Sequence, residues 1–357
     1  MRRASWLLAL LIALLSAAAC GTAGQVGGSE TTSAGTAAPT ATGSAPQTTT
    51  EGVTPTWRNP PGVPDPNSRM LLGAYVDLSG QSSQHASVKA RERAMGRAYD
   101  LLLTYYNWTD SFPDAHEAAM VAGGTTPLMA WYLPDKNTGS TASLSAIAAG
   151  SDDAWIATQA HAIKAFGHRV YLRLAPEMNG DWYRYSGDPA AYVAAWRHVW
   201  HVFHQAGVSN VTWVWCPNLT PADNWDSYYP GRAYVDVIGV DSFSNVKYTW
   251  QTFQEMFEGF FKHFAASAPG KPQMVVETAT NSGKGAPVVG IGSAASFISG
   301  MQSYLENVAG PKYNVIGVCW FDSDTNDGIN WRVDQTAESW QAWLTLARDP
   351  YFGGSSS

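Results

Sequence analysis

The sequence predicts a (β/α)8 barrel over residues 69–350, and three observations support this fold class. Eight short apolar or β-rich segments recur between Leu71 and Asp322, and helical patterns lie between most of them. Near-continuous apolar strands that alternate with helices indicate a parallel sheet buried on both faces. The eight units, from Leu71 to Ala347, fit the length of about 250 residues that is typical of this barrel. An open doubly wound sheet is less favoured, because no glycine-rich phosphate loop follows any strand.

The expected strands and helices can be placed along this segment in order. The strands are residues 71–79, 101–108, 126–133, 169–177, 211–218, 235–243, 272–280 and 315–322. Clear helical patterns cover residues 86–100, 151–167 and 188–207, and residues 250–267, 294–308 and 336–347 complete the series. The patterns at 151–167 and 188–207 end on a glycine, as helices often do. No clear helical pattern follows the second strand.

The N-terminus is expected to direct export and lipid attachment. Two arginines precede a short apolar stretch, and the small residues SAAAC end at Cys20, which resembles a bacterial lipobox. Residues 1–20 are therefore expected to be a lipoprotein signal peptide, with Cys20 anchored on the extracellular face of the cell membrane. Ordinary secretion after cleavage nearby is the alternative. Residues 21–68, rich in Gly, Ser, Thr, Ala and Pro, are expected to be a disordered tether, and residues 351–357 a flexible tail.

Composition narrows the class of partner. The formal net charge of -7 and the pI near 5.6 leave no basic stripe that could bind nucleic acid. The chain holds 16 Trp and 16 Tyr, whose rings stack well on the apolar faces of sugars, although many of them will fill the core. Cys216 and Cys319 lie within expected strands, so we expect buried free thiols, although export would permit a disulfide.

Polar and aromatic residues gather where the expected strands end. In a (β/α)8 barrel the carboxyl ends of the strands carry the active site. Glu177 ends the fourth strand and Glu277 the seventh, three βα units apart, so their carboxylates are expected to converge. Cleavage of a glycosidic bond with retention requires one protonated and one ionised carboxyl group. The other candidates at these strand ends are Asp77, Trp108, Trp131, Asn179, Trp215, Asn218, Asp241, Trp320 and Asp322.

Four stretches together resemble glycoside hydrolase family 26, which holds mainly β-mannanases with some β-1,3-xylanases and mixed-linkage glucanases. They are RLAPEMNGDWYRYSG, YYPGRAYVDVIGVDSF, PQMVVETAT and CWFDSDTNDGINWRVD, and the resemblance covers roughly residues 70–345. It implies a (β/α)8 barrel that acts with retention. By position it implies Glu177 as the general acid/base and Glu277 as the nucleophile. It further implies that Trp182 and Trp320 line the sugar subsites, with Asp241 beside them.

Two positions depart from the family pattern. Pro176 stands where the family usually has a histidine that touches the sugar, which leaves the preference for mannose open. Phe243 stands where the family tends to place a tyrosine that steadies the nucleophile. A phenyl ring cannot donate a hydrogen bond, so Glu277 loses a partner or borrows one, with Tyr183 and Tyr185 as possible donors.

Further residues are candidates for binding substrate. Arg173 lies four residues before Glu177 on the same strand face, so it either holds carboxylates in place or forms a salt bridge inside the barrel. The complete set of expected substrate-binding residues is Asn179, Trp182, Tyr183, Asp241, Trp320, Trp331 and Arg173. The tryptophans among them could instead fill the core.

Two patterns that suggest a metal are better explained otherwise. His198, His201 and His204 drift round a helix outside the catalytic mouth, which favours a packed or solvated face. The segment DSDTNDG, residues 322–328, lacks the glycine and the glutamate that an EF-hand needs at positions six and twelve. We expect no metal and no organic cofactor.

The residues therefore predict an enzyme: a monomeric, retaining, endo-acting β-glycoside hydrolase with a polysaccharide substrate, β-1,4-mannan first. One alternative is a catalytically silent glycan-binding lipoprotein on the same barrel, because fold alone does not establish activity. Another keeps the hydrolase but changes the substrate to β-1,3-xylan, mixed-linkage β-glucan or a cell-surface glycan.

Overall fold

The structure is a computed structural model that describes residues 58–78, 80–134, 142–245, 250–281, 292–324 and 329–354. The chain divides into two units, residues 1–53 and 54–357, and all described residues belong to the second unit. The expected signal peptide, the lipid-bearing Cys20 and most of the expected tether lie outside the described residues. Within the described residues, no helix combines the length and the hydrophobicity that crossing a bilayer requires.

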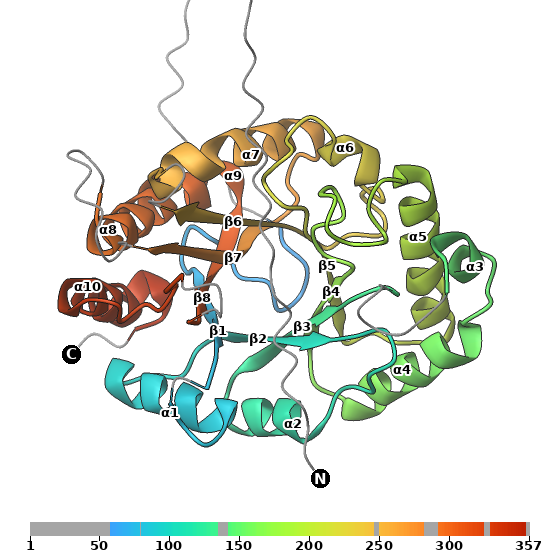
Figure 1. Cartoon of the computed structure of the whole chain (residues 1–357), viewed down its shortest axis with the longest axis horizontal. Coiled ribbons are helices and arrows are strands. Elements are labelled where there is room, and N and C mark those ends of the chain that lie inside the picture. Colours follow the sequence, from blue (N-terminus) through green and yellow to red (C-terminus); the bar gives the residue numbers. More distant parts are fainter. Residues whose placement is uncertain are drawn as a thin grey trace, which may run out of the picture. The chain divides into compact units, whose positions relative to one another are not determined.

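The predicted barrel is confirmed. Eight parallel strands close into a barrel in chain order, each paired with its neighbours in the sequence and the last with the first (Figure 1). All eight expected strands are present, most of them slightly shorter than their sequence patterns. Their bounds are β1 Leu71–Val76, β2 Leu101–Tyr106, β3 Thr126–Trp131, β4 Val170–Leu174, β5 Val211–Trp215, β6 Val237–Asn245, β7 Gln273–Asn281 and β8 Val315–Asp322.

Helices surround the barrel and cover the outer face of the sheet (Figure 1). All six expected helical patterns form helices, and the unclear region after β2 contains a short helix as well. The fifth unit departs from the pattern, because only one helical turn, α6, lies between β5 and β6. The bounds are α1 Gln84–Met95, α2 Ala115–Ala122, α3 Leu144–Ala148, α4 Asp153–Phe166, α5 Pro189–Gln205, α6 Trp225–Tyr228, α7 Phe253–Ser267, α8 Ala294–Tyr304, α9 Gly310–Tyr313 and α10 Ala337–Arg348.

Local sequence explains where these helices begin and what they bury. Helix α7 starts at a capping box in which Thr252 and Glu255 satisfy each other's backbone N–H groups. Its apolar stripe, Phe257, Phe260, Phe261 and Phe264, is completely buried and follows the spacing of an amphipathic helix that packs on a sheet.

The segment before β1 belongs to the folded part of the chain. Asn59 donates to the side chain of Asn314 (3.0 Å), and the hydroxyl of Tyr351 donates to the carbonyl of Pro66 (2.5 Å). Val63 is buried against the core. Residues 58–68, which the composition assigned to the tether, therefore pack on the barrel.

Strand β7 carries an irregularity that matters for the site. The pairing of β6 with β7 shifts register between Val240 and Asp241, so that Asp241 lies opposite Glu277. A bulge of this kind re-aims side chains, and bulges concentrate at barrel rims and active sites. The shift places two carboxylates from neighbouring strands opposite each other, Asp241 fully buried and Glu277 nearly so.

Candidate active site

The chain makes an unusual turn directly after β4, and this turn contains Glu177. Ala175 and Glu177 have φ angles of 43° and 55°, in the left-handed region that side-chain-bearing residues rarely adopt. Neighbouring elements hold this turn, because the backbone N–H of Glu177 donates to the carbonyl of Cys216 (2.8 Å) and the hydroxyl of Tyr185 donates to the carbonyl of Pro176 (2.9 Å). Strained backbone of this sort costs about 1–3 kcal/mol per residue and clusters at functional sites.

The carboxyl group of Glu177 is oriented by two neutral donors. It is 4% exposed, accepts a hydrogen bond from Nε1 of Trp182 (3.0 Å) on one oxygen and accepts one from Nδ2 of Asn218 (2.8 Å) on the other. Burial, reinforced by the negative charge of Glu277, raises the pKa of Glu177, and the charge of Arg173 and the two hydrogen bonds offset only part of this rise. This carboxyl group is therefore set up to hold a proton.

Glu277 sits in the opposite electrostatic environment. Nη1 of Arg173, which is 1% exposed inside the barrel, donates to Oε1 of Glu277, and Nη2 of the same guanidinium donates to Asp241. The thiol of Cys216 lies 3.3 Å from the second oxygen of Asp241. A permanently charged guanidinium bonded to a carboxylate favours its ionised form. Glu277 is thus held by a buried chain of side-chain contacts that runs from Cys216 through Asp241 and Arg173, named here the Arg173 network.

The two glutamates belong to one site. The charge of Glu277 contributes to the raised pKa of Glu177, and Arg173 acts on both groups. The Arg173 network and the turn that carries Glu177 also meet at Cys216. Its carbonyl accepts from the backbone N–H of Glu177, and its thiol faces Asp241. Glu177 and Glu277 thus share Arg173 as a charged neighbour, and their joint role in catalysis stays a prediction.

Arg173 and Asp241 lie beneath the site and do not line it. Arg173 forms salt bridges inside the barrel and also fixes the carboxylate of Glu277, so both interpretations of this arginine from the sequence apply. Asp241 is 0% exposed and fully engaged by Arg173 and Cys216, so the expectation that it contacts the sugar is corrected. The donor that Phe243 cannot supply to Glu277 comes from Arg173. Tyr183 and Tyr185 do not supply it, since they bond to Tyr132 and to the carbonyl of Pro176.

Asn179 and Trp182 act on the glutamate that precedes them. Asn179 is 2% exposed; its side chain accepts from the N–H of Asn218 (2.8 Å) and donates to the carbonyl of Asn218 (2.9 Å). It therefore positions the amide that holds Glu177. Trp182 is half-buried and folds over Gly180, where a Cβ would come within 2.3 Å of the indole ring. Glycine is required there by this close approach.

Trp320 is placed differently from the expectation. It is 1% exposed, its ring contacts Phe297 of α8 and Trp343 of α10, and its Nε1 donates to the carbonyl of Trp331 (2.9 Å). Side chains alternate along a strand, so the neighbouring Phe321 points to the other face. The prediction that Trp320 forms a sugar platform is therefore wrong, because its indole belongs to the layer between strand and helices.

The remaining candidates at the strand ends are mostly packed away from the mouth. Trp108 and Trp131 stack on each other at 4.5 Å in the core, and Trp215 packs against Tyr229 and Phe264. Trp331 is 3% exposed and contacts Phe243 (5.1 Å). Cys216 and Cys319 are both free and buried, as predicted.

Four aromatic side chains that were not predicted as site residues form a continuous arc beside Glu277, named here the aromatic arc. It consists of Phe243, Phe321, Tyr75 and Tyr105, from the carboxyl ends of β6, β8, β1 and β2, and all four are partly exposed. Their ring centroids follow one another at 5.6, 5.1 and 5.1 Å. The charge of Glu277 contributes to raising the pKa of both Tyr75 and Tyr105. The strand alternation that excludes Trp320 is the signal that could have identified Phe321.

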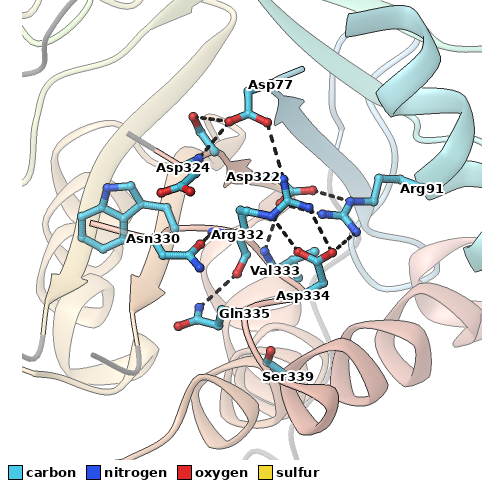
Figure 2. Close-up of polar contacts among 12 residues, drawn as sticks. Asp77, Arg91, Asp322, Asp324, Asn330, Arg332, Val333, Asp334, Gln335 and Ser339 are labelled. Atoms are coloured by element: carbon cyan, nitrogen blue, oxygen red, sulfur yellow. Dashed lines mark hydrogen bonds and ion pairs between the residues drawn. The ribbon is translucent and has the colours of Figure 1, made fainter. Parts of the chain in front are cut away.

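A second polar network fixes the chain after β8, and Figure 2 shows it. Arg91 of α1 bonds Asp322 (2.8 Å) and Asp334 (2.6 Å), and Arg332 bonds Asp334 (3.0 Å) and approaches Asp77 (3.8 Å). Burial alone would raise the pKa of Asp334, but hydrogen bonds from the two guanidinium groups lower it to about 2. Asp77 and Asp322 therefore support the segment that carries Trp331, and neither carboxylate is free to face a substrate.

The histidines and the acidic segment contribute nothing to the mouth in the described residues. His198 pairs with Asp153, and His204 stacks on Trp200 at 4.9 Å on the outer helix α5. Residues 325–328 of the DSDTNDG segment lie outside the described residues. The carboxylate of Asp322 in that segment is occupied by Arg91 and by the N–H of Val333 (3.0 Å).

Together these features define a class: a (β/α)8 barrel that holds two buried carboxylates with different hydrogen-bond donors beside partly exposed aromatic rings. Comparison with known proteins gives the family. Residues 141–283 match the model of glycosyl hydrolase family 26.

The most similar curated relatives differ in what their names describe. Endoglucanase H of Acetivibrio thermocellus is 28% identical over 309 residues, which are 82% of this chain and 31% of that protein. Mannan endo-1,4-beta-mannosidase A and B of Caldalkalibacillus mannanilyticus is 30% identical over 117 residues, 30% of this chain and 23% of that protein. The matched part of this chain therefore spans less than a third of the length of either relative.

Solved structures share the fold. A modular endo-beta-1,4-mannanase from Cellulomonas fimi superposes with a TM-score of 0.58 at 18% identity, covering 80% of this chain and 72% of that one. A Bacillus subtilis mannanase superposes with a TM-score of 0.54 at 17% identity, covering 78% and 92%. At these identities the likeness concerns the barrel alone.

Proposed function

We propose that this protein is a retaining, endo-acting β-glycoside hydrolase that cleaves a β-linked polysaccharide, with β-1,4-mannan as the first candidate. The observation that carries the proposal is the contrast between two carboxyl groups in one site. Burial and the charge of Glu277 raise the pKa of Glu177, whereas Glu277 is bonded by the guanidinium of Arg173. Two carboxyl groups in one site, one among neutral donors and one beside a cation, suit an acid and a nucleophile.

In the first step, Glu177 gives its proton to the bridging oxygen as the bond to the leaving sugar breaks. Glu277 attacks the anomeric carbon and forms a covalent glycosyl intermediate. Its Oε1 is occupied by Arg173, so the other oxygen is the attacking atom. Trp182 and Asn218 hold the carboxyl group of Glu177 in one orientation while the proton leaves.

In the second step, the roles of the two groups follow from the same electrostatics. Once Glu277 is an ester, it carries no charge, and the contribution that it makes to the raised pKa of Glu177 disappears. Glu177, now ionised, takes a proton from water, which attacks the anomeric carbon and restores Glu277 with retention of configuration. No step in this sequence calls for a metal or an organic cofactor.

A second substrate class, β-glucan, is favoured by one observation. The relative that aligns over most of this chain is named an endoglucanase, whereas the mannan-cleaving relatives align over about 30% of it. Pro176 supports the same direction, because it removes the histidine that the family resemblance would place against the sugar.

The glycan-binding alternative loses part of its motivation in the structure. It rested on Pro176 and Phe243, but Glu277 has a charged donor in Arg173 and Glu177 has two neutral donors. An inactive binding protein has no need to keep two carboxyl groups buried with such different hydrogen-bond donors.

Digestion of a glycan panel tests the proposal. The wild-type chain is incubated with β-1,4-mannan, mixed-linkage β-glucan and β-1,3-xylan, and the products are sized. We expect oligosaccharides from one of them, their loss in Glu177→Gln and Glu277→Gln, and normal products from Glu306→Gln, a control on the outer layer. A 2-fluoro aryl glycoside should label Glu277; labelling of another residue by an active enzyme would contradict the assignment. Binding without products across the panel would favour the alternative.

We also propose that Cys20 carries lipid and holds the enzyme on the outer face of the cell membrane. The support is the sequence alone, with its basic start, apolar run and small residues before Cys20. Cys20→Ser should move the protein from the membrane fraction into the medium and abolish fatty-acid labelling. An unlabelled wild-type protein would rule the anchor out.

A further inference from the structure

The hydroxyl group of Tyr105 is the one polar group of the aromatic arc that is inaccessible to solvent and has no hydrogen-bond partner in the described part of the chain. Tyr105 lies near the end of β2, with its ring 5.1 Å from Tyr75 and 6.2 Å from Tyr132. A buried donor left unpaired costs free energy, and such groups in native structures call for an explanation.

The neighbouring tyrosines at the mouth do not share this property. The hydroxyl groups of Tyr132 and Tyr183 bond to each other, that of Tyr185 donates to Pro176, and that of Tyr192 donates to Ala175 (3.1 Å). Burial and the charge of Glu277 raise the pKa of Tyr105 well above its ordinary value, so its hydroxyl remains a donor at any working pH. Among these tyrosines, only Tyr105 has a buried and unpaired hydroxyl group, although Nε of Arg173, which bonds Glu277 through Nη1, is unpaired as well.

The arrangement of the acid and the nucleophile decides which sugar comes near Tyr105. The groups that hold Glu177, Trp182 and Asn218, come from the loops after β4 and β5. Because Glu177 protonates the departing oxygen, the leaving sugar lies toward these loops. The aromatic arc flanks Glu277 from β6, β8, β1 and β2, so the sugar that Glu277 captures, the glycone, lies against the arc.

We propose that the hydroxyl of Tyr105 donates a hydrogen bond to the glycone, and that Tyr75, Phe321 and Phe243 cover the apolar face of the same sugar. This inference rests on the proposed hydrolase function and deepens it by assigning the subsite next to Glu277. An oxygen of the sugar then supplies the hydrogen-bond acceptor that the hydroxyl of Tyr105 lacks in the free protein. The arc offers apolar ring faces to the sugar elsewhere, and such faces stack on its C–H bonds.

The test compares Tyr105→Phe with Tyr304→Phe, a matched control on α8 whose hydroxyl is also buried and unpaired. Kinetics are measured on the polysaccharide that the wild type cleaves. Tyr105→Phe should lower kcat/KM by about 10- to 100-fold, the rate equivalent of one buried hydrogen bond, whereas Tyr304→Phe should leave it within twofold. Neither variant should lower the melting temperature, because each removes a donor that has no partner in the free protein.

A substrate with a dinitrophenyl leaving group separates contact with the glycone from acid catalysis. Such a leaving group needs no proton, so Glu177→Gln should lose little in the first step, while the loss in Tyr105→Phe should persist. A folded Tyr105→Phe variant that matches the wild type on both substrates would overturn the inference but leave the hydrolase intact. A wild type that turns over no β-glycoside would overturn the proposed function and this inference together.

Discussion

The barrel holds its two glutamates, the proposed acid Glu177 and the proposed nucleophile Glu277, by different means. Glu177 sits on a strained turn after β4 and is oriented by neutral donors, Trp182 and Asn218, from loops. Glu277 follows a bulge in β7 and is bonded by Arg173, which also bonds Asp241, and Asp241 in turn contacts Cys216. Burial raises the pKa of Glu177 among neutral donors, whereas Glu277 is bonded to a buried cation. The contrast shows how one fold can make two identical side chains chemically different.

The largest effect should come from removing the acid. Glu177→Ala should lower the rate on the natural polysaccharide by about 10²–10⁴-fold, the usual contribution of general acid–base catalysis. Azide should then replace water in the second step and give a β-glycosyl azide, because the vacated position admits a small anion. An α-configured azide product would contradict retention.

On the nucleophile side, loss of Arg173 should mainly affect stability. Arg173→Met leaves two buried carboxylates unpaired and should cost about 3–5 kcal/mol in the free energy of unfolding, measured with urea. The exposed Arg184→Met is the control and should change it by less than about 0.5 kcal/mol. Adding Asp241→Asn to Arg173→Met should recover part of the lost free energy of unfolding. A further decrease in this free energy would show that the Arg173 network is not held together by charge.

A smaller effect is expected at Cys216, where the two sides meet. Cys216→Ala removes the thiol that faces Asp241 and should cost about 1–2 kcal/mol more than Cys319→Ala, a second buried thiol that makes no such contact. Cys216→Ser keeps a donor, so it should retain more activity than Cys216→Ala. Equal costs for the two alanine variants would mean that packing alone explains Cys216.

The smallest effect should be a change of pH profile on the acid side. The N–H of Trp182 favours the ionised form of Glu177, so Trp182→Phe should raise the pKa of Glu177 further. Glu177 must be protonated in the first step, and its acid form would then persist to higher pH. The alkaline limb of the kcat/KM profile should therefore move to higher pH, while a move to lower pH would show that the indole does not act on Glu177.

The sequence was sufficient for the barrel, because apolar strands recur at regular spacing. It also placed the two glutamates at strand ends, which share one mouth in a barrel, but their catalytic roles stay a prediction. It was insufficient wherever the direction of a side chain decides its role. Trp320 and Phe321 are adjacent aromatics at the end of β8, and only the pleat of the strand tells which of them packs against the helices and which against Tyr75. The bulge that sets Asp241 opposite Glu277 has no pattern in the residues.

Long-range polar contacts were equally invisible. Asn179 was expected to bind sugar, but it holds Asn218, 39 residues later in the chain. Arg91 on α1 holds Asp322 and Asp334, near the other end of the barrel domain, and a helix surface of charged residues gives no indication of that pairing. Residues 58–68 have the composition of the expected tether, but they pack on the barrel through individual contacts such as that of Asn59 with Asn314.

The most direct test of the account is the pKa of Glu177 measured by carbon-13 NMR in the wild type and in Glu277→Gln. The account predicts a wild-type pKa above that of an ordinary glutamate, and a lower pKa in Glu277→Gln, because the neutral amide no longer repels the ionised form. Glu306→Gln should leave the value unchanged. A pKa of Glu177 that is ordinary in the wild type, or that does not fall when the charge of Glu277 is removed, would contradict the claim that the two groups share one catalytic site.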